Sequence, residues 1–167
     1  MIDHTFVICA YGQSPYLATC IQSLQRQEMA SSIIMVTSTE NDYIHRLAYQ
    51  YGIPLFCHEE GGLGKDWNFG LRCAQTGFVT LAHQDDVYLK HYLSQLMTLF
   101  LNHPEGLIAF SDYGEIRSGQ FVAPNVNLKI KKMMLAAMAV HPSGKPLRRR
   151  ILGFGNPICC PSVTYNR

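Results

Sequence analysis

One stretch decides the fold: Phe78-Val79-Thr80-Leu81-Ala82-His83-Gln84-Asp85-Asp86, an apolar run of β-prone residues that ends in two adjacent carboxylates. In an open α/β sheet, ligands bind beyond the carboxyl ends of the strands, and a carboxylate pair there can hold a divalent cation that meets phosphate oxygens. Aspartate is also a favoured helix N-cap residue, so this pair can instead cap a helix expected to begin near Lys90. The stretch alone leaves both interpretations open.

Strands and helices alternate around this stretch. Buried strands are predicted at residues 5–10, 32–36, 54–58 and 107–111, and helices at 42–51, 65–75, 90–103 and from Ser14-Pro15 through Leu24. This alternation, with helices of about 10 to 14 residues, is typical of right-handed crossovers that cover both faces of a parallel sheet. The predicted fold class is therefore α/β, a Rossmann-like three-layer sandwich with a mostly parallel central sheet.

The regular alternation of strands and helices ends at Asp112. We predict a hairpin over residues 113–122 that turns at Ser118-Gly119, a methionine-rich amphipathic helix over 128–140, and a short strand over 162–165. No linker is evident, so we expect a single domain over residues 1–167.

Composition excludes several classes of protein. The chain has 167 residues, of which 47% are hydrophobic and 16% charged, as expected of a globular domain. No apolar run approaches the roughly 18 residues that a membrane span needs, and the first residues lack the basic start of a signal peptide, so we expect a cytoplasmic protein. The six cysteines show no CxxC spacing and are expected to be reduced thiols, neither disulfides nor zinc ligands.

Charge is divided unevenly along the chain. Residues up to Glu115 carry all 12 acids and 5 bases, a balance of −7, whereas the rest carries 9 bases and no acid. Such a cationic segment can meet phosphates, acidic glycans or anionic lipid, or it can be a solvated face. No nucleic-acid-binding motif accompanies it, so nucleic acid is not an expected partner. The lysines beside the methionines of the 128–140 helix leave open a peripheral contact with the inner face of a membrane, core packing, or a homo-oligomer contact.

Three familiar phosphate-binding patterns are absent or incompatible. The first turn, Ala10-Tyr11-Gly12-Gln13-Ser14, is not GxGxxG. Gly64-Lys65 is followed by Asp66, and Glu59 stands where a P-loop needs its first glycine. A response-regulator-like domain would need acids after the first strand, where this chain has none. What remains is a nucleotide bound without a glycine-rich cradle, where a metal carries the charge of the diphosphate.

Several short motifs, in order, resemble the donor-binding half of family 2 glycosyltransferases. They are Val7-Ile8-Cys9-Ala10-Tyr11, Pro15-Tyr16-Leu17, Cys20-Ile21-Gln22-Ser23-Leu24, the Ser38-Thr39 turn with Asp42, Asn68-Phe69-Gly70-Leu71 with Ala74, and the acidic strand end. The resemblance covers about residues 5–112. It implies a GT-A fold, a nucleotide-diphospho-sugar donor and transfer to an acceptor hydroxyl with inversion at the anomeric centre.

The resemblance also implies roles for individual residues. It places four residues around the base and ribose of the donor: Ala10, Tyr11, Thr37 and Ser38. Asp85 would take the second acidic position of the DxD motif and bind Mn²⁺ or Mg²⁺ at the diphosphate, with Asp86 supporting it.

The chain departs from the family pattern at several positions. His83 stands at the first acid of DxD, Thr37-Ser38 replaces the common Asp, and Trp67 replaces an Arg that often precedes the Asn. Trp67 can stack on a ligand or belong to the core. Donor contacts are also expected from Lys65, Asn68, His83 and Gln84.

The acceptor half is only partly represented, over residues 113–167. No acid follows Glu115, so the base that the family places further downstream is missing from this sequence. Of the two late carboxylates, Asp112 at a strand end is the better candidate for a general base, and it can instead be structural. Residues 155–167 resemble the stretch just before the family's acceptor site, which indicates a C-terminally truncated transferase. Three alternatives stay open: a fragment that retains donor binding, a short enzyme that uses a partner chain or His141 as base, and a non-catalytic nucleotide-sugar-binding module. The acceptor, a glycan or a lipid-linked molecule, is not indicated.

Overall fold

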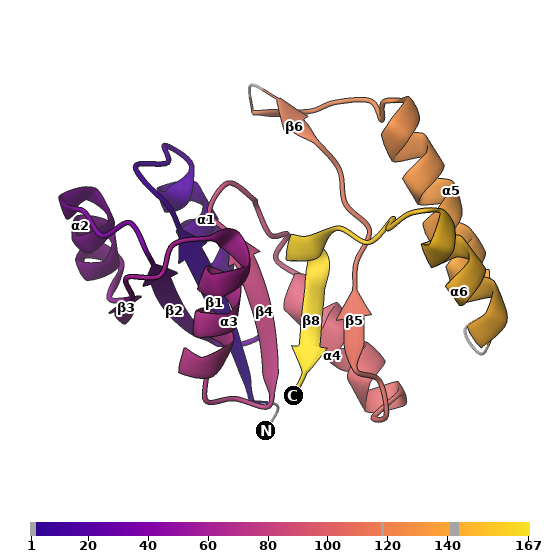
Figure 1. Ribbon diagram of the computed structural model, residues 1–167, viewed down its shortest axis with the longest axis horizontal. Coiled ribbons are helices and arrows are strands. Elements are labelled where there is room, and N and C mark those ends of the chain that lie inside the picture. Colours follow the sequence, from indigo (N-terminus) through magenta and orange to yellow (C-terminus); the bar gives the residue numbers. More distant parts are fainter. Residues whose placement is uncertain (1–2, 118, 141–143) are drawn as a thin grey trace. The chain divides into compact units, whose positions relative to one another are not determined.

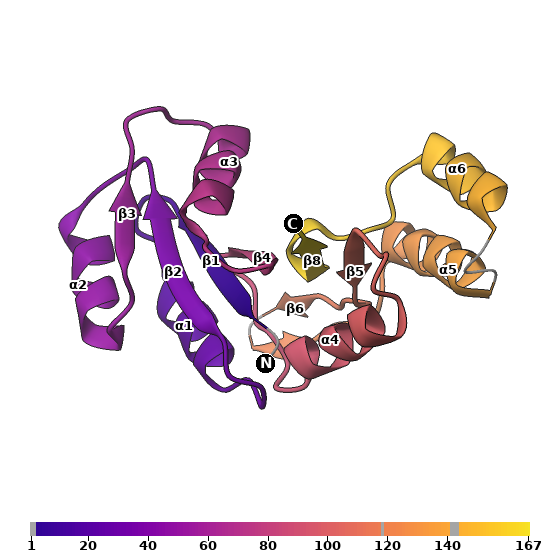
Figure 2. The same cartoon turned by 90° about the horizontal axis from the view of Figure 1, so that it is seen from below.

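The computed structural model describes residues 3–117, 119–140 and 144–167. The chain divides into two compact units (Figures 1 and 2). The first unit contains the residues up to Ala109 together with Val163–Arg167, and the second contains Phe110–Ser162. His141, named above as a base, lies outside the described residues.

The central sheet is mostly parallel, as predicted, and it has six strands. Its order is β3-β2-β1-β4-β8-β5. The strands are β1 (His4–Ala10), β2 (Ser32–Thr37), β3 (Leu55–Cys57), β4 (Phe78–His83), β5 (Ile108–Phe110) and β8 (Val163–Asn166). β1 pairs in parallel with β2 and β4, and β2 pairs in parallel with β3. β8 pairs antiparallel with β4, a position that the isolated strand pattern near residue 163 did not predict.

Helices cover both faces of this sheet, which confirms the three-layer sandwich (Figure 2). They are α1 (Leu17–Gln25), α2 (Asp42–Tyr51), α3 (Leu63–Cys73) and α4 (Tyr92–Asn102). Because successive strand residues point to opposite faces, Phe6 and Ile8 pack in one core with α1, α2 and α4, while Val7 packs in a second core with α3.

Local signals explain the ends of α2. The Asn41 side chain accepts from the backbone N–H groups of Tyr43 and Ile44, and Gly52 ends the helix in a left-handed conformation with φ of 63°. The observed bounds are those predicted. α1 begins later than its Ser14-Pro15 signal, because Tyr16 occupies the N-cap position.

The second unit contains the predicted hairpin and helix. The hairpin pairs β6 (Ile116–Arg117) with β7 (Gln120–Phe121), and α5 (Val126–Val140) follows it. Ser118, part of the predicted turn, lies outside the described residues. A further helix, α6 (Lys145–Phe154), was not predicted, and a 3-10 turn spans Cys160–Ser162. Among the described helices, none combines the length and the apolar character needed to cross a membrane.

Candidate functional site

Four parallel strands end at one edge of the sheet. Their last residues are Ala10 of β1, Thr37 of β2, Cys57 of β3 and His83 of β4. The register sets Ala10 beside Thr37, Thr37 beside Cys57, and Cys9 beside His83. We call residues 10–12, 37–41, 57–58 and 83–86 the carboxyl edge. In open α/β sheets ligands bind at such an edge, so the fold brings together most of the residues predicted at a donor.

The side-chain amide of Gln84 joins the loops after β1 and β4. Its Oε1 accepts a hydrogen bond from the backbone N–H of Tyr11 at 2.9 Å, and its Nε2 donates to the carbonyl of Tyr11 at 3.0 Å. Both halves of the amide therefore engage the backbone. Gln84, predicted to contact the ligand, here fixes the position of Tyr11, whose ring is exposed.

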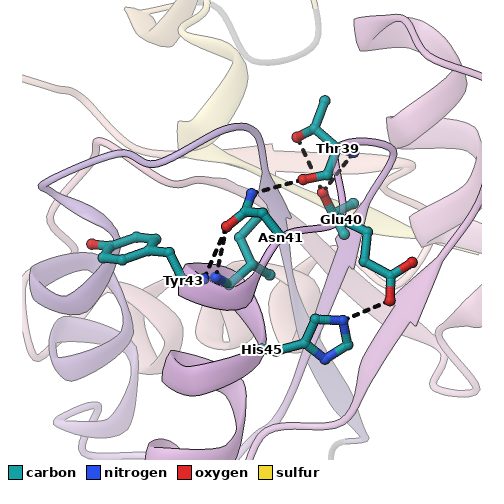
Figure 3. A network of polar contacts seen from close by, with 7 residues as sticks. Thr39, Glu40, Asn41, Tyr43 and His45 are labelled. Atoms are coloured by element: carbon teal, nitrogen blue, oxygen red, sulfur yellow. Dashed lines mark hydrogen bonds and ion pairs between the residues drawn. The ribbon is translucent and has the colours of Figure 1, made fainter.

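A second network joins the loops after β1 and β2, and Figure 3 shows its members Thr39 and Asn41. The N–H of Gly12 donates to Thr39 Oγ1 at 2.8 Å, and Asn41 Nδ2 donates to the carbonyls of Gly12 and Thr39 at 3.1 and 2.8 Å. Gly12 has φ of 59°, a conformation that favours glycine. Sequence reasoning missed Asn41 as a link between these loops, although an Asn just before a helix is a recognisable capping signal.

His83, Asp85 and Asp86 form the anionic part of the carboxyl edge. One potential metal-ligand atom from each lies within 4.8 Å of the others, and His83 Nδ1 is 3.9 Å from Asp86 Oδ2. Burial and the neighbouring charge of Asp85 raise the pKa of Asp86, whereas His83 lowers it. The Cys20 thiol donates to the carbonyl of His83 at 3.2 Å, and burial together with the two carboxylates raises its pKa to about 12.

These carboxylates do not cap the following helix. α4 begins at Tyr92 with His91 at its N-cap position and with no side-chain cap hydrogen bond. The capping alternative offered by the sequence is therefore wrong. Two adjacent carboxylates, one of them half-buried, repel each other, and a divalent cation with a preference for oxygen ligands would offset that repulsion. The residues present therefore fit Mn²⁺ or Mg²⁺.

Helix α3 brings Trp67 against the edge. The Trp67 and His83 rings are stacked, with centroids 5.5 Å apart and planes at 26°. Trp67 also packs beside the core that contains Val7. Three atoms here, Trp67 Nε1, His83 Nε2 and Ser38 Oγ, are buried and have no hydrogen-bond partner among the described residues. Because buried polar atoms are nearly always paired, these atoms need a partner that the described residues do not provide, such as a polar ligand or a water molecule.

Sequence reasoning missed a histidine and an aspartate beside these atoms. His58 directly follows β3, and its backbone N–H donates to the backbone carbonyl of Thr37 at 3.1 Å. Its Nε2 lies 2.9 Å from Oδ1 of the buried Asp66, although the two atoms are not aligned as a hydrogen bond. The strand-end rule that selected Asp85 also selects His58, so the signal was present.

Other predicted residues lie in different surroundings. Ala10 and Thr37 are buried, so at Ala10 the backbone is what can face a ligand. Lys65 and Asn68 are exposed on α3, and Lys65 Nζ lies 3.3 Å from Glu60 Oε2. The donor contacts of all these residues stay predictions.

Asp112 belongs to the second unit. Its Oδ2 accepts a hydrogen bond from Lys132 Nζ at 2.8 Å, and its side chain is largely exposed. Its role as general base also stays a prediction.

A family profile matches almost the whole chain. The profile is that of glycosyl transferase family 2, and it matches residues 5–167. The chain belongs to this family. A sequence comparison with curated proteins found no match.

Solved structures similar to this family 2 chain have low sequence identity to it. TarS 1-349 from S. aureus is 17% identical with a TM-score of 0.62, over 99% of this chain and 47% of that one. Glucosyl-3-phosphoglycerate synthase from Mycobacterium tuberculosis, in complex with Mn²⁺ and UDP-Glc, is 14% identical with a TM-score of 0.66, over 99% and 56%. The mannosyltransferase PcManGT from Pyrobaculum calidifontis, in complex with GDP-Man and Mn²⁺, is 17% identical with a TM-score of 0.54, over 63% and 34%.

These likenesses show the GT-A-like fold. The chain spans 23%, 38% and 47% of the three S. aureus TarS chains it was compared with. It is thus shorter than half of each of them.

Proposed function

We propose that this family 2 chain binds a nucleotide-diphospho-sugar at its carboxyl edge and passes the sugar to an acceptor hydroxyl, with Mn²⁺ or Mg²⁺ at the diphosphate and inversion at the anomeric centre. One observation carries the proposal: the acid pair and three unpaired buried polar atoms gather at the same edge. The M. tuberculosis and P. calidifontis proteins, which hold Mn²⁺ together with UDP-Glc and GDP-Man respectively, support it as structural relatives.

Each part of the edge would contribute differently. Asp85 and Asp86 hold the cation, which when bound offsets the negative charge of the departing diphosphate. His83 Nε2 and Trp67 Nε1 form hydrogen bonds to diphosphate or ribose oxygens. Both atoms are buried without a hydrogen-bond partner among the described residues, so a ligand oxygen would remove the cost of leaving them unpaired.

The remaining donor contacts surround the base and the phosphates. Ser38 Oγ bonds to the ribose or base, and the exposed ring of Tyr11 stacks beside the base. Lys65 and Asn68 add contacts from the exposed side of α3. Asp112 is the proposed general base for the acceptor hydroxyl, which belongs to a glycan or a lipid-linked molecule.

One observation favours a second candidate function, donor binding without transfer. Residues 116–167 contain no Asp or Glu, so this part of the sequence offers no carboxylate as an alternative to Asp112 and Glu115. The two functions differ in one product. Release of a nucleoside diphosphate from a sugar nucleotide in the presence of metal supports transfer, whereas binding without release supports the module.

Thermal shift with a panel of nucleotide sugars, with and without Mn²⁺, tests donor binding. A ligand at 100 times its Kd stabilises the folded state by about 2.7 kcal/mol. For a chain of this size that corresponds to a rise in Tm of roughly 5–10 °C. Asp85→Ala should lose the metal-dependent part of this rise. Glu105→Ala, which removes an exposed carboxylate elsewhere in the first unit, should keep it. Equal shifts for wild type and Asp85→Ala contradict the assignment.

Isothermal titration with Trp67→Phe tests the unpaired atoms. The substitution keeps an aromatic ring and removes the N–H donor, so loss of one hydrogen bond of about 1–1.5 kcal/mol should weaken donor binding roughly 5–10-fold. Tyr49→Phe removes a polar atom from a highly exposed ring on α2 and is the matched control. Unchanged affinity in Trp67→Phe would mean that Nε1 does not face the ligand.

A further inference from the structure

A second group of metal-ligating side chains lies at the outer end of the carboxyl edge. Glu40 is in the turn between β2 and α2, His45 is in the first turns of α2, and Cys57 is the last residue of β3. One ligand atom from each lies within 4.8 Å of the others, and all three residues are exposed. Figure 3 shows Glu40 and His45 directed toward each other, with Oε1 and Nε2 2.6 Å apart.

We propose that Glu40, His45 and Cys57 form a zinc site, with the carboxylate, the imidazole Nε2 and the thiolate as protein ligands and water in the fourth position. This donor set is one that Zn²⁺ takes in proteins. Ligand atoms bound tetrahedrally at about 2.0–2.3 Å lie roughly 3.4 Å apart. Adjustments of side-chain torsions are therefore enough to convert the observed cluster into a tetrahedral one.

The backbone that carries these ligands is already fixed. Thr39 and Asn41 flank Glu40, and both are tied to Gly12 by hydrogen bonds. Asn41 also caps α2, the helix that carries His45. The backbone N–H of His45 donates to the backbone carbonyl of Asn41 at 3.1 Å. Cys57 is held beside Thr37 in the sheet register. Metal binding would thus order only three side chains, which keeps its entropic cost small.

The ligand chemistry separates this group from the acid pair. Thiolate and imidazole suit Zn²⁺, whereas paired carboxylates suit Mn²⁺ and Mg²⁺. The absence of CxxC spacing led to the expectation that no cysteine binds zinc, and the proposal departs from it for Cys57. Spacing could not reveal this group, because its ligands come from a turn, a helix and a strand. Although Cys57 is exposed, partial desolvation of its thiol and the nearby Glu40 carboxylate raise its pKa, which argues against a role as a reactive nucleophile.

Zinc at this position would link β3 and α2, which make few contacts with each other. β3 has three residues and lies at the end of the sheet order, and α2 follows the turn that contains Glu40. Binding should therefore stabilise the first unit and shield Cys57 from alkylation, both without any sugar nucleotide.

Titration of the full chain with Zn²⁺ and Co²⁺ tests the proposal. We expect binding of one ion per chain, a cobalt spectrum with thiolate charge transfer and tetrahedral d–d bands, and slower alkylation of Cys57. Cys57→Ser and His45→Gln should each weaken zinc binding by at least about 10-fold, the lower bound of effects measured for residues that support metal ligands.

Two control variants make the result specific. Cys73→Ser removes a thiol from α3, outside the group, and Asp85→Ala removes one carboxylate of the acid pair. Both should retain zinc affinity. Absence of binding at micromolar zinc, or binding that survives Cys57→Ser, would overturn the proposal. Loss of zinc in Asp85→Ala would assign the ion to the acid pair and would also overturn it. None of these outcomes depends on donor binding.

Discussion

Substitution of Gly70 by alanine should disturb the packing of α3 on the sheet. An added Cβ would lie 2.5 Å from Val7 Cγ1 and 3.3 Å from Val36 Cγ2, whereas carbon atoms at optimal contact are about 3.5–4.0 Å apart. Both valines are fully buried, and β-branched side chains have little rotamer freedom, so they cannot turn away. The helix must therefore move outward.

Two opposing effects set the magnitude. Overpacking of this kind costs about 1–3 kcal/mol, and the higher helix propensity of alanine returns up to about 1 kcal/mol. We expect a net loss of roughly 1–2 kcal/mol, which for a chain of this size lowers Tm by about 2–8 °C. Urea denaturation followed by far-UV circular dichroism measures the free energy of unfolding directly.

Gly64 provides the matched control, since it lies in the same helix and an added Cβ there meets no atom within 4 Å. Gly64→Ala should leave stability unchanged or raise it by up to about 1 kcal/mol. If Gly70→Ala proves at least as stable as Gly64→Ala, then α3 does not approach the sheet as closely as described, and the position of Trp67 at the carboxyl edge loses its support.

Two further predictions concern charge. The raised pKa of Asp86 means that the folded protein holds this proton to a higher pH than the unfolded chain, so metal-free stability should fall as pH rises from below 3.8 through the raised value. Asp86→Asn should lack that fall, melt higher than wild type in chelator at pH 7, and lose the stabilisation by Mn²⁺; a lower Tm in chelator would contradict this. The arginines of α6, near its exposed Phe154, should bind phosphatidylserine vesicles at low salt. At about 1 kcal/mol per charge, joint replacement of Arg149 and Arg150 by alanine should weaken flotation roughly 30-fold, with phosphatidylcholine vesicles as the control, and undiminished flotation would refute the contact.

Elements with local start and stop signals were predictable from sequence. α2 has an Asn cap, a helical apolar period and a left-handed glycine, and its predicted bounds match the structure. α6 was missed although its sequence carries helix signals: Leu147, Ile151 and Phe154 recur at helical spacing, and Pro146 stands in its first turn. The insertion of β8 beside β4 depends on long-range pairing, which a strand pattern does not encode.

In the candidate site, too, some features were predictable from the sequence and others were not. Residues at strand ends, such as His83 and Asp85, follow from the alternation of strands and helices, because every parallel strand delivers its end to the same edge. Contacts between loops do not follow from it. The strand pattern gave no sign that the Gln84 amide, predicted to contact a ligand, hydrogen-bonds to the backbone of Tyr11. Asp66 precedes Trp67 in the sequence, and only the packing of α3 shows that it is buried against His58.

The stack of Trp67 on His83 gives this chain an optical reporter. Trp67 is its sole tryptophan, so the intrinsic emission of the protein comes from one indole beside the acid pair. The fluorescence of an indole depends on what its ring contacts, so displacement of the His83 ring by a ligand should change its intensity and its wavelength. Occupancy of the carboxyl edge can thus be followed in unlabelled protein, at nanomolar concentration and on the millisecond scale of a stopped-flow instrument.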